Sequence, residues 1–137
     1  MLGSSELRAG FSSNESDSPM YTCENIVSRF RDRKRSANMV LCGTDCYADA
    51  QSRGNIKSPF DGNVVCGFDT MEYMLDNTFS KLGIDTDRVD HPLLLTEPLC
   101  NPEYSRGQMN ELLFEAYQVQ SVHDGLAALF SANANNV

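Results

Sequence analysis

The chain has 137 residues and a net charge of −8, and 41% of its residues are hydrophobic. This length suffices for one domain with a core, and the acidic balance argues against a small autonomous nucleic-acid-binding domain. The sequence lacks an apolar run long enough to span a membrane. Its first ten residues also lack the basic start and apolar stretch of a secretory signal.

The five cysteines are predicted to be free thiols, because a chain without a secretory signal is expected in a reducing compartment. Their odd number agrees with this. Cys42 and Cys46 suggest a metal site, but zinc pairs usually have tighter spacing and a second pair. We therefore expect no metal site. The sequence also shows no nucleophile–histidine–acid arrangement and no P-loop pattern.

The first half of the chain is predicted to hold short strands joined by polar loops. The strand candidates, with their β-branched and apolar residues, are 6–12, 23–28 and 39–42. Residues 29–57 are expected to form a basic, loop-rich insertion. The segment 58–63 is predicted to be a turn because of its Pro, Asp-Gly and Asn.

The second half is predicted to be more regular. Apolar residues at helical spacing indicate a helix that Gly83 ends, and Asp69 with Glu72 fits a capping box at its start. Leu93–Leu95 is a continuous apolar run, typical of a strand buried on both faces.

A second capping box, Ser105 with Gln108, predicts the start of the next helix, which ends near Tyr117. Asp124 is expected to cap a last helix, and 131–137 to form a frayed tail. Alternation of helices and strands favours the α/β class.

Five basic side chains cluster in one short segment: Arg29, Arg31, Arg33, Lys34 and Arg35. One interpretation is a solvated surface loop. The other is a contact patch for DNA phosphate or an acidic protein surface, where arginine makes paired, charge-assisted hydrogen bonds. The sequence leaves both open. His91 precedes a proline at the start of a predicted strand, and we expect a structural histidine that bonds to the backbone.

A turn of small residues near the start is a candidate phosphate-binding element. Gly3, Ser4 and Ser5 lie between two extended segments, where backbone amides can approach phosphate oxygens. Arg8 follows and would neutralise the anion. Such a turn is also common without any ligand, so alone it does not indicate nucleotide binding.

Several stretches, in order along the chain, resemble the actin family. Gly3-Ser4 with Arg-Ala-Gly-Phe at 8–11 resembles the family's first phosphate-binding hairpin. Ile-Val-Ser-Arg at 26–29 resembles Ile-Val-Gly-Arg, and Asp-Ala-Gln-Ser-Arg-Gly at 49–54 resembles Asp-Glu-Ala-Gln-Ser-Lys-Arg-Gly. His-Pro-Leu-Leu-Leu-Thr-Glu at 91–97 resembles His-Pro-Val-Leu-Leu-Thr-Glu.

The resemblance implies a partial actin-like (RNase H-like) ATPase fold: roughly the first half, without its first strand. Residues 1–137 would be an incomplete N-terminal actin-like domain, in which Met1 and Leu2 stand where the family has Asp-Asn. Nucleotide in that fold lies in a cleft between two halves, and hydrolysis needs groups from both sides. We therefore expect no enzyme activity and no cofactor for this fragment, while a full-length form could hold ATP.

Other segments resemble a nuclear branch of the family, and they are 58–61, 100–106, 111–117 and 129–131. The resemblance implies a non-catalytic subunit of an INO-type chromatin-remodelling complex in the nucleus. Such a subunit works with a small partner subunit and the remodeller's ATPase, supporting nucleosome remodelling, transcription regulation and DNA repair. Gly3, Ser4, Ser5 and Arg8 would then be a vestigial phosphate hairpin.

Two alternatives stay open. One is an enzyme, either an actin-like ATPase or a related sugar-kinase-like phosphotransferase, and the other is a filament-forming, ATP-binding actin of cytoskeletal type. A strand missing from the sheet would leave an exposed edge and a partly uncovered apolar face. We therefore expect marginal stability or aggregation when the chain is expressed alone.

Overall fold

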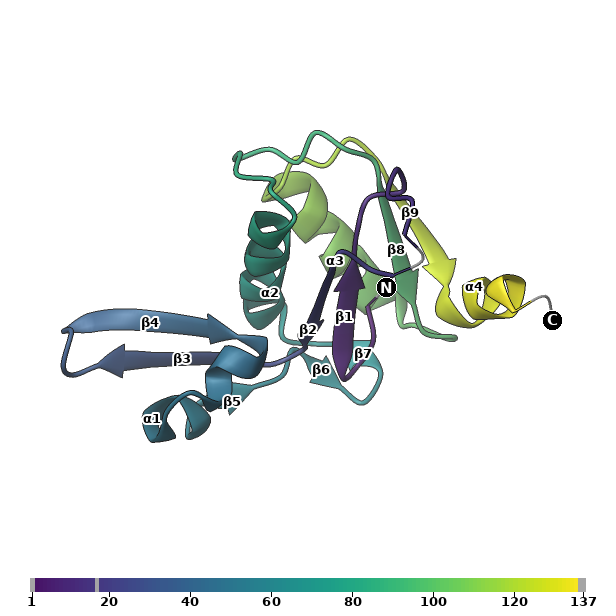
Figure 1. Ribbon diagram of the computed structural model, residues 1–137. Coiled ribbons are helices and arrows are strands. Elements are labelled where there is room, and N and C mark those ends of the chain that lie inside the picture. The colour runs from purple at the N-terminus through teal and green to yellow at the C-terminus, as the bar shows by residue number, and fades with distance from the viewer. Residues whose placement is uncertain (1, 17, 136–137) are drawn as a thin grey trace.

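The computed structural model describes residues 2–16 and 18–135, and these form a mixed α/β structure (Figure 1). The strands of the first half are β1 (Glu6–Ala9), β2 (Tyr21–Glu24), β3 (Val27–Asp32), β4 (Ala37–Cys42), β5 (Ile56–Lys57), β6 (Phe60–Asp61) and β7 (Val64–Val65). A 3-10 helix η1 (Gly43–Tyr47) and helix α1 (Ala50–Arg53) lie between β4 and β5. The second half holds α2 (Phe68–Lys81), β8 (Leu93–Glu97), α3 (Glu103–Glu115), β9 (Val122–Leu126) and α4 (Ala127–Ala134).

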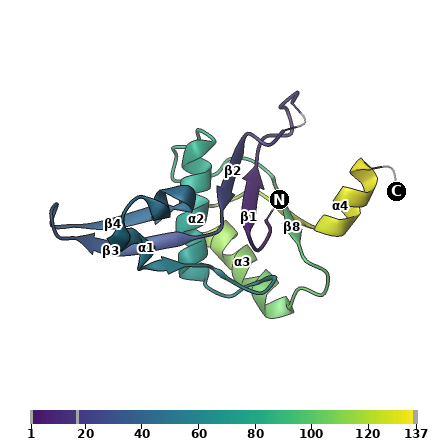
Figure 2. The same ribbon diagram turned by 60° about the horizontal axis from the view of Figure 1, so that its bottom comes forward.

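These elements form a body and a projecting hairpin. In the body, α2 and α3 pack together beside the β1–β2 pair and the β8–β9 pair (Figure 1). The β3–β4 hairpin extends away from this body in both views, and α4 lies at the opposite end (Figures 1 and 2). The described residues therefore form a mixed α/β fold, the class that the sequence predicts.

The core lies where α2 and α3 meet. Met71, Met74 and Leu113 are fully buried, and Phe79 packs its ring edge-on against Tyr117 with centroids 5.1 Å apart. The buried positions of α2 recur at the spacing of one helix face. The predicted helix is thus confirmed, and Gly83 follows it with φ +83, a left-handed conformation that glycine adopts without strain.

Both predicted capping boxes are wrong. Helix α2 begins after Gly67 and α3 after Pro102, and neither start has a side-chain cap. Asp69 is exposed in the first turn of α2. Ser105 is buried and donates its hydroxyl to the Val65 carbonyl at 2.9 Å, so packing between α3 and β7 determines its position.

The expectation that residues 29–57 are rich in loops is wrong for most of this segment, whereas the strand predicted at 39–42 is confirmed within β4. Strands β3 and β4 pair antiparallel over six positions, from Val27 opposite Cys42 to Asp32 opposite Ala37. Strand β5 pairs on the other side of β3, and Asp49 caps α1 by accepting from the Ser52 amide at 2.7 Å. Arg29 and Arg31 occupy alternate positions of β3, so the alternation that indicates a strand is carried there by charged residues.

The β8–β9 pair is parallel, with Leu93 opposite Val122 and Glu97 opposite Leu126. The prediction of a strand here is confirmed, but burial on both faces is not, because Leu94 is 55% exposed. Asp124 lies inside β9 and does not cap a helix.

The predicted frayed tail is wrong over residues 131–134, because they belong to helix α4, while 136–137 lie outside the described residues. Leu129 on α4 is 60% exposed. Leu94 and Leu129 therefore leave apolar surface exposed to solvent. Marginal stability of the isolated chain stays a prediction.

Replacing Gly107 with alanine should stabilise the chain. Gly107 lies inside α3, and a Cβ added there would meet no atom within 4 Å. Glycine inside a helix costs about 0.5–1 kcal/mol relative to alanine, so the free energy of unfolding should rise by about that amount. Urea unfolding followed by circular dichroism measures it, and an unchanged or lower midpoint would contradict the packing around α3.

Candidate binding site

The small-residue turn at the start closes tightly on β1. The Gly3 amide donates to the Glu6 carbonyl at 3.0 Å, and Leu2 forms an isolated antiparallel bridge with Leu7. Asn25 donates its side-chain amide to the Gly3 carbonyl, and the Leu2 amide donates to Thr96 Oγ1 at 2.9 Å. The predicted turn is therefore present. Within the described residues, Leu2 alone represents the extended segment before the turn, through its bridge to Leu7.

Arg8, the cation predicted to neutralise a phosphate, is engaged within its own strand. Its Nε donates to Glu6 Oε2 at 2.9 Å, and its Nη2 lies 2.8 Å from the same oxygen. The two residues are two positions apart in β1, so their side chains lie on the same face of the strand. An anion at this turn would compete with Glu6 for the guanidinium.

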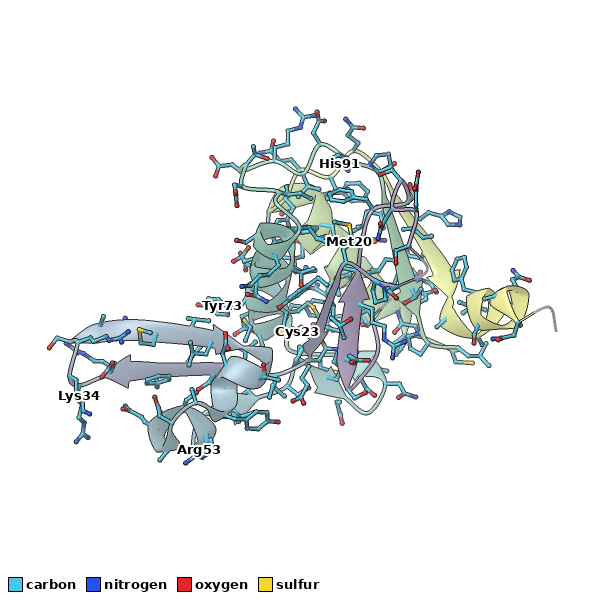
Figure 3. All side chains as sticks on the ribbon, viewed as in Figure 1. Met20, Cys23, Lys34, Arg53, Tyr73 and His91 are labelled. Atoms are coloured by element: carbon cyan, nitrogen blue, oxygen red, sulfur yellow. The ribbon has the colours of Figure 1, made fainter. Side chains whose placement is uncertain are left out.

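The structure divides the basic cluster into two groups. Arg29 and Arg31 lie in β3, whereas Arg33, Lys34 and Arg35 lie in the loop at the outer end of the hairpin, where Figure 3 labels Lys34. Within this loop, Arg35 pairs with Asp32 at 3.7 Å. The interpretation of the basic cluster as a solvated surface loop is wrong for Arg29 and Arg31, which lie in β3. Contact of the cluster with a partner stays a prediction.

The inner group lines a groove of about 520 Å³ between the hairpin and the start of α2. Arg29 places its guanidinium carbon 4.9 Å from the centre of the Tyr73 ring. Lys57, Val40 and Asp69 also line the groove. Sequence reasoning missed these three and Tyr73. The pairing of β5 with β3, which places Lys57 opposite Val27, could have indicated Lys57 alone.

A charged pair joins β8 to α3. Arg106 donates to both carboxylate oxygens of Glu97, at 3.0 and 2.6 Å, and Asn101 donates to the same group at 3.1 Å. The Arg106 hydrogen bonds hold the pKa of Glu97 below its ordinary value, whereas burial raises that of Asp124. Glu97 therefore stays ionised at neutral pH and ties the two elements together.

Replacing Arg106 with glutamine should destabilise the chain at neutral pH and make its stability less dependent on acid. A lowered carboxyl pKa gives stability that is present above the ordinary pKa and is lost as pH falls through the folded value. Without Arg106 the pKa of Glu97 is no longer lowered by the pair, so the variant lacks this stability at neutral pH and has less to lose as the pH falls. Urea midpoints should differ most near pH 7 and converge below about pH 4. Arg33→Gln is the matched control, and an equal shift in both variants would contradict the pair's role.

All five cysteines lie within the described residues and are free thiols. Burial raises the pKa of Cys42 to about 12 and also raises that of Cys46, so both stay protonated at neutral pH. Metal binding requires thiolates. No group of three His, Cys, Asp or Glu side chains in residues 2–16 and 18–135 is arranged to hold a metal ion.

His91 differs from the expected structural histidine. It is exposed, and its ring packs edge-on against Phe11 with centroids 5.3 Å apart (Figure 3). The contact joins the loop after β1 to the segment before β8.

Within residues 2–16 and 18–135, every helix is too short or too polar to cross a bilayer.

The turn at Gly3, the paired strands and the two packed helices together define an actin-type fragment. A family model described as actin matches residues 2–136, and the chain belongs to the actin family. Within that family it is similar to proteins named actin-like protein arp5 or actin-related protein 5. It is 50% identical to the Schizosaccharomyces pombe protein over 129 residues, 94% of this chain and 17% of that protein.

Two further relatives show the same pattern of coverage. The chain is 38% identical to actin-related protein 5 of Homo sapiens over 133 residues, and 38% identical to that of Drosophila melanogaster over 146 residues. Each match covers 94% of this chain and 22% of the relative. The chain thus spans about a fifth of the length of these curated relatives.

Proposed function

We propose that this chain belongs to a non-catalytic, partner-binding subunit of an INO-type chromatin-remodelling complex in the nucleus. There it would bind the remodeller's ATPase and a small partner subunit, and support ATP-dependent nucleosome remodelling, transcription regulation and DNA repair. The observation that carries the proposal is the 50% identity over 129 residues to actin-like protein arp5, joined to the branch-specific segments of the sequence.

The surface of those segments supports a binding role. Tyr104 is 72% exposed and Phe114 is 45% exposed, both on α3, and Leu99 before this helix is 76% exposed. Large apolar side chains in contact with water are favourable anchors for a partner, because burying each one removes apolar area from solvent. Tyr104 and Phe114 lie within the segments that resemble the nuclear branch, and Leu99 lies just before one of them.

The engaged state of Arg8 supports the non-catalytic part of the proposal. Its guanidinium already pairs with Glu6, and phosphoryl transfer requires clamps on the phosphates from both sides of a cleft. The retained turn at Gly3 favours the alternative, an actin-like ATP-binding protein or ATPase of cytoskeletal type. ATP turnover separates the two.

Affinity purification from nuclear extract tests the binding role. A tagged form of this chain should recover the remodeller ATPase and a small partner subunit, identified by mass spectrometry, and a full-length form serves as the positive control. A double replacement of Tyr104 and Phe114 by serine should reduce recovery. If the full-length control recovers remodeller subunits and this chain recovers none, the proposal fails for this segment.

A further inference from the structure

The groove between the hairpin and α2 presents three cations on one sheet face. Arg29 lies opposite Val40, Arg31 lies opposite Asn38, and Lys57 lies opposite Val27. Residues opposite one another in an antiparallel pair share a face, as do alternate residues along a strand. The pairing of β4, β3 and β5 therefore places Arg29, Arg31 and Lys57 on the same surface.

The second wall of the groove comes from α2 and holds Arg29 in place. Figure 3 shows Tyr73 on the side of α2 that faces the hairpin. The Arg29 guanidinium lies over this ring, with its central carbon 4.9 Å from the ring centre, which is a cation–π contact. Its N–H donors lie in the plane of the group, so they stay available to a carboxylate.

The lining combines positive charge with apolar surface. Against three cations the groove has one carboxylate, Asp69, in a chain whose total charge is −8. Val40 is 40% exposed at the same surface, and Tyr73 adds an aromatic ring. An occupant that complements this lining carries negative charges beside an apolar side chain.

We propose that this groove binds a short acidic segment of a partner protein. Its carboxylates pair with Arg29, Arg31 and Lys57, and an apolar side chain between them packs on Val40 and Tyr73. The inference rests on the proposed partner-binding function and assigns a chemistry to one of its contacts.

The dimensions of the groove favour a peptide over a nucleic acid. A volume of about 520 Å³ is in the range that holds a few side chains or a small ligand. Duplex DNA presents phosphates on a rigid convex surface, and it would meet the projecting loop with Arg33, Lys34 and Arg35 before the groove. The two occupants therefore depend on different arginines of the same hairpin.

Fluorescence anisotropy with the complete chain tests the inference. The probe is a short labelled peptide of alternating Glu and Leu, and the comparison probes are alternating Glu and Ser, alternating Lys and Leu, and duplex DNA. Only the Glu–Leu peptide should bind well. Arg31→Glu should weaken this binding by about tenfold or more, the effect of one charge-assisted hydrogen bond.

Arg33→Glu is the matched control, because it makes the same charge change on the same hairpin outside the groove. It should change the peptide affinity by less than about twofold, since exposed charges at a distance are screened. Arg31→Ala, with circular dichroism to verify the fold, separates loss of binding from charge reversal.

Three results would overturn the inference: equal weakening by Arg31→Glu and Arg33→Glu, equal binding of the Glu–Ser peptide, or Arg31-dependent binding of DNA without peptide binding. If the Glu–Leu peptide does not bind while remodeller subunits still co-purify with the chain, only the inference about the groove is wrong. If the peptide binds but no subunit co-purifies, the proposed function fails instead.

Discussion

Replacing Gly43 with alanine is expected to lower the free energy of unfolding by about 2–4 kcal/mol, the sum of backbone strain and overpacking. Gly43 begins η1 with φ +65, a left-handed conformation that an L side chain rarely adopts. A Cβ there would lie 2.5 Å from the Sγ of Cys23, which is buried in β2. Urea unfolding of the two proteins measures the difference.

Two further variants separate the causes of this loss. Gly62 has φ +61 and no atom within 4 Å of an added Cβ, so Gly62→Ala should cost only the strain, about 1–2 kcal/mol. Cys23→Ala removes the sulfur that the new methyl group meets. The double replacement of Gly43 and Cys23 should therefore lose less than the sum of the single changes. A strictly additive result would show that the contact is absent in solution.

Replacing Leu113 with alanine should have the largest effect, a loss of about 3–5 kcal/mol in the free energy of unfolding. The Leu113 side chain has no exposed surface and belongs to the core cluster formed with α2. Its removal forfeits buried apolar area and leaves a cavity. In a chain of marginal stability this loss should abolish the cooperative transition.

Phe114→Ala is the control for this prediction. Phe114 is the next residue in α3, and it is 45% exposed, so its truncation should cost less than about 1 kcal/mol. Thermal unfolding monitored by circular dichroism compares the two variants. If Phe114→Ala destabilises the chain as much as Leu113→Ala, the face of α3 that meets α2 has been assigned wrongly.

The helices could be predicted because their signals are local. Met71, Leu75 and Phe79 recur at helical spacing, and Gly83 ends the pattern. Their starts could not be predicted, because α2 begins at Gly67 and α3 at Pro102 without side-chain caps. Of the residues that suggested these caps, Ser105 instead donates its hydroxyl to the Val65 carbonyl, and Asp69 is exposed.

The first strand of the hairpin could not be predicted over its full length because its alternation is carried by arginine. Arg29 and Arg31 occupy strand positions where an apolar residue would have indicated a sheet face, and Phe30 alone marks the other face. The helix cap predicted at Asp124 is wrong because nothing local indicates a parallel partner, and the pairing of Asp124 with Leu95 spans 29 residues of sequence. Such pairing depends on the assembled fold.

The candidate site was only partly predictable for the same reason. The turn at Gly3 and the basic cluster could be recognised by composition. Their division into a groove and a loop depends on strand register, and Tyr73 and Lys57 reach the groove from elements distant in sequence. The pairing of Arg8 with Glu6 required only the alternation of β1, and this signal was available.

ATP turnover by the purified chain tests the non-catalytic account most directly. With Mg²⁺ and ATP present, phosphate release should equal that of buffer alone, and titration calorimetry should show no tight nucleotide binding. Release above buffer that is lost in Arg8→Ala but kept in the matched control Arg53→Ala would contradict the account. It would show that the turn at Gly3 performs phosphoryl chemistry in this chain.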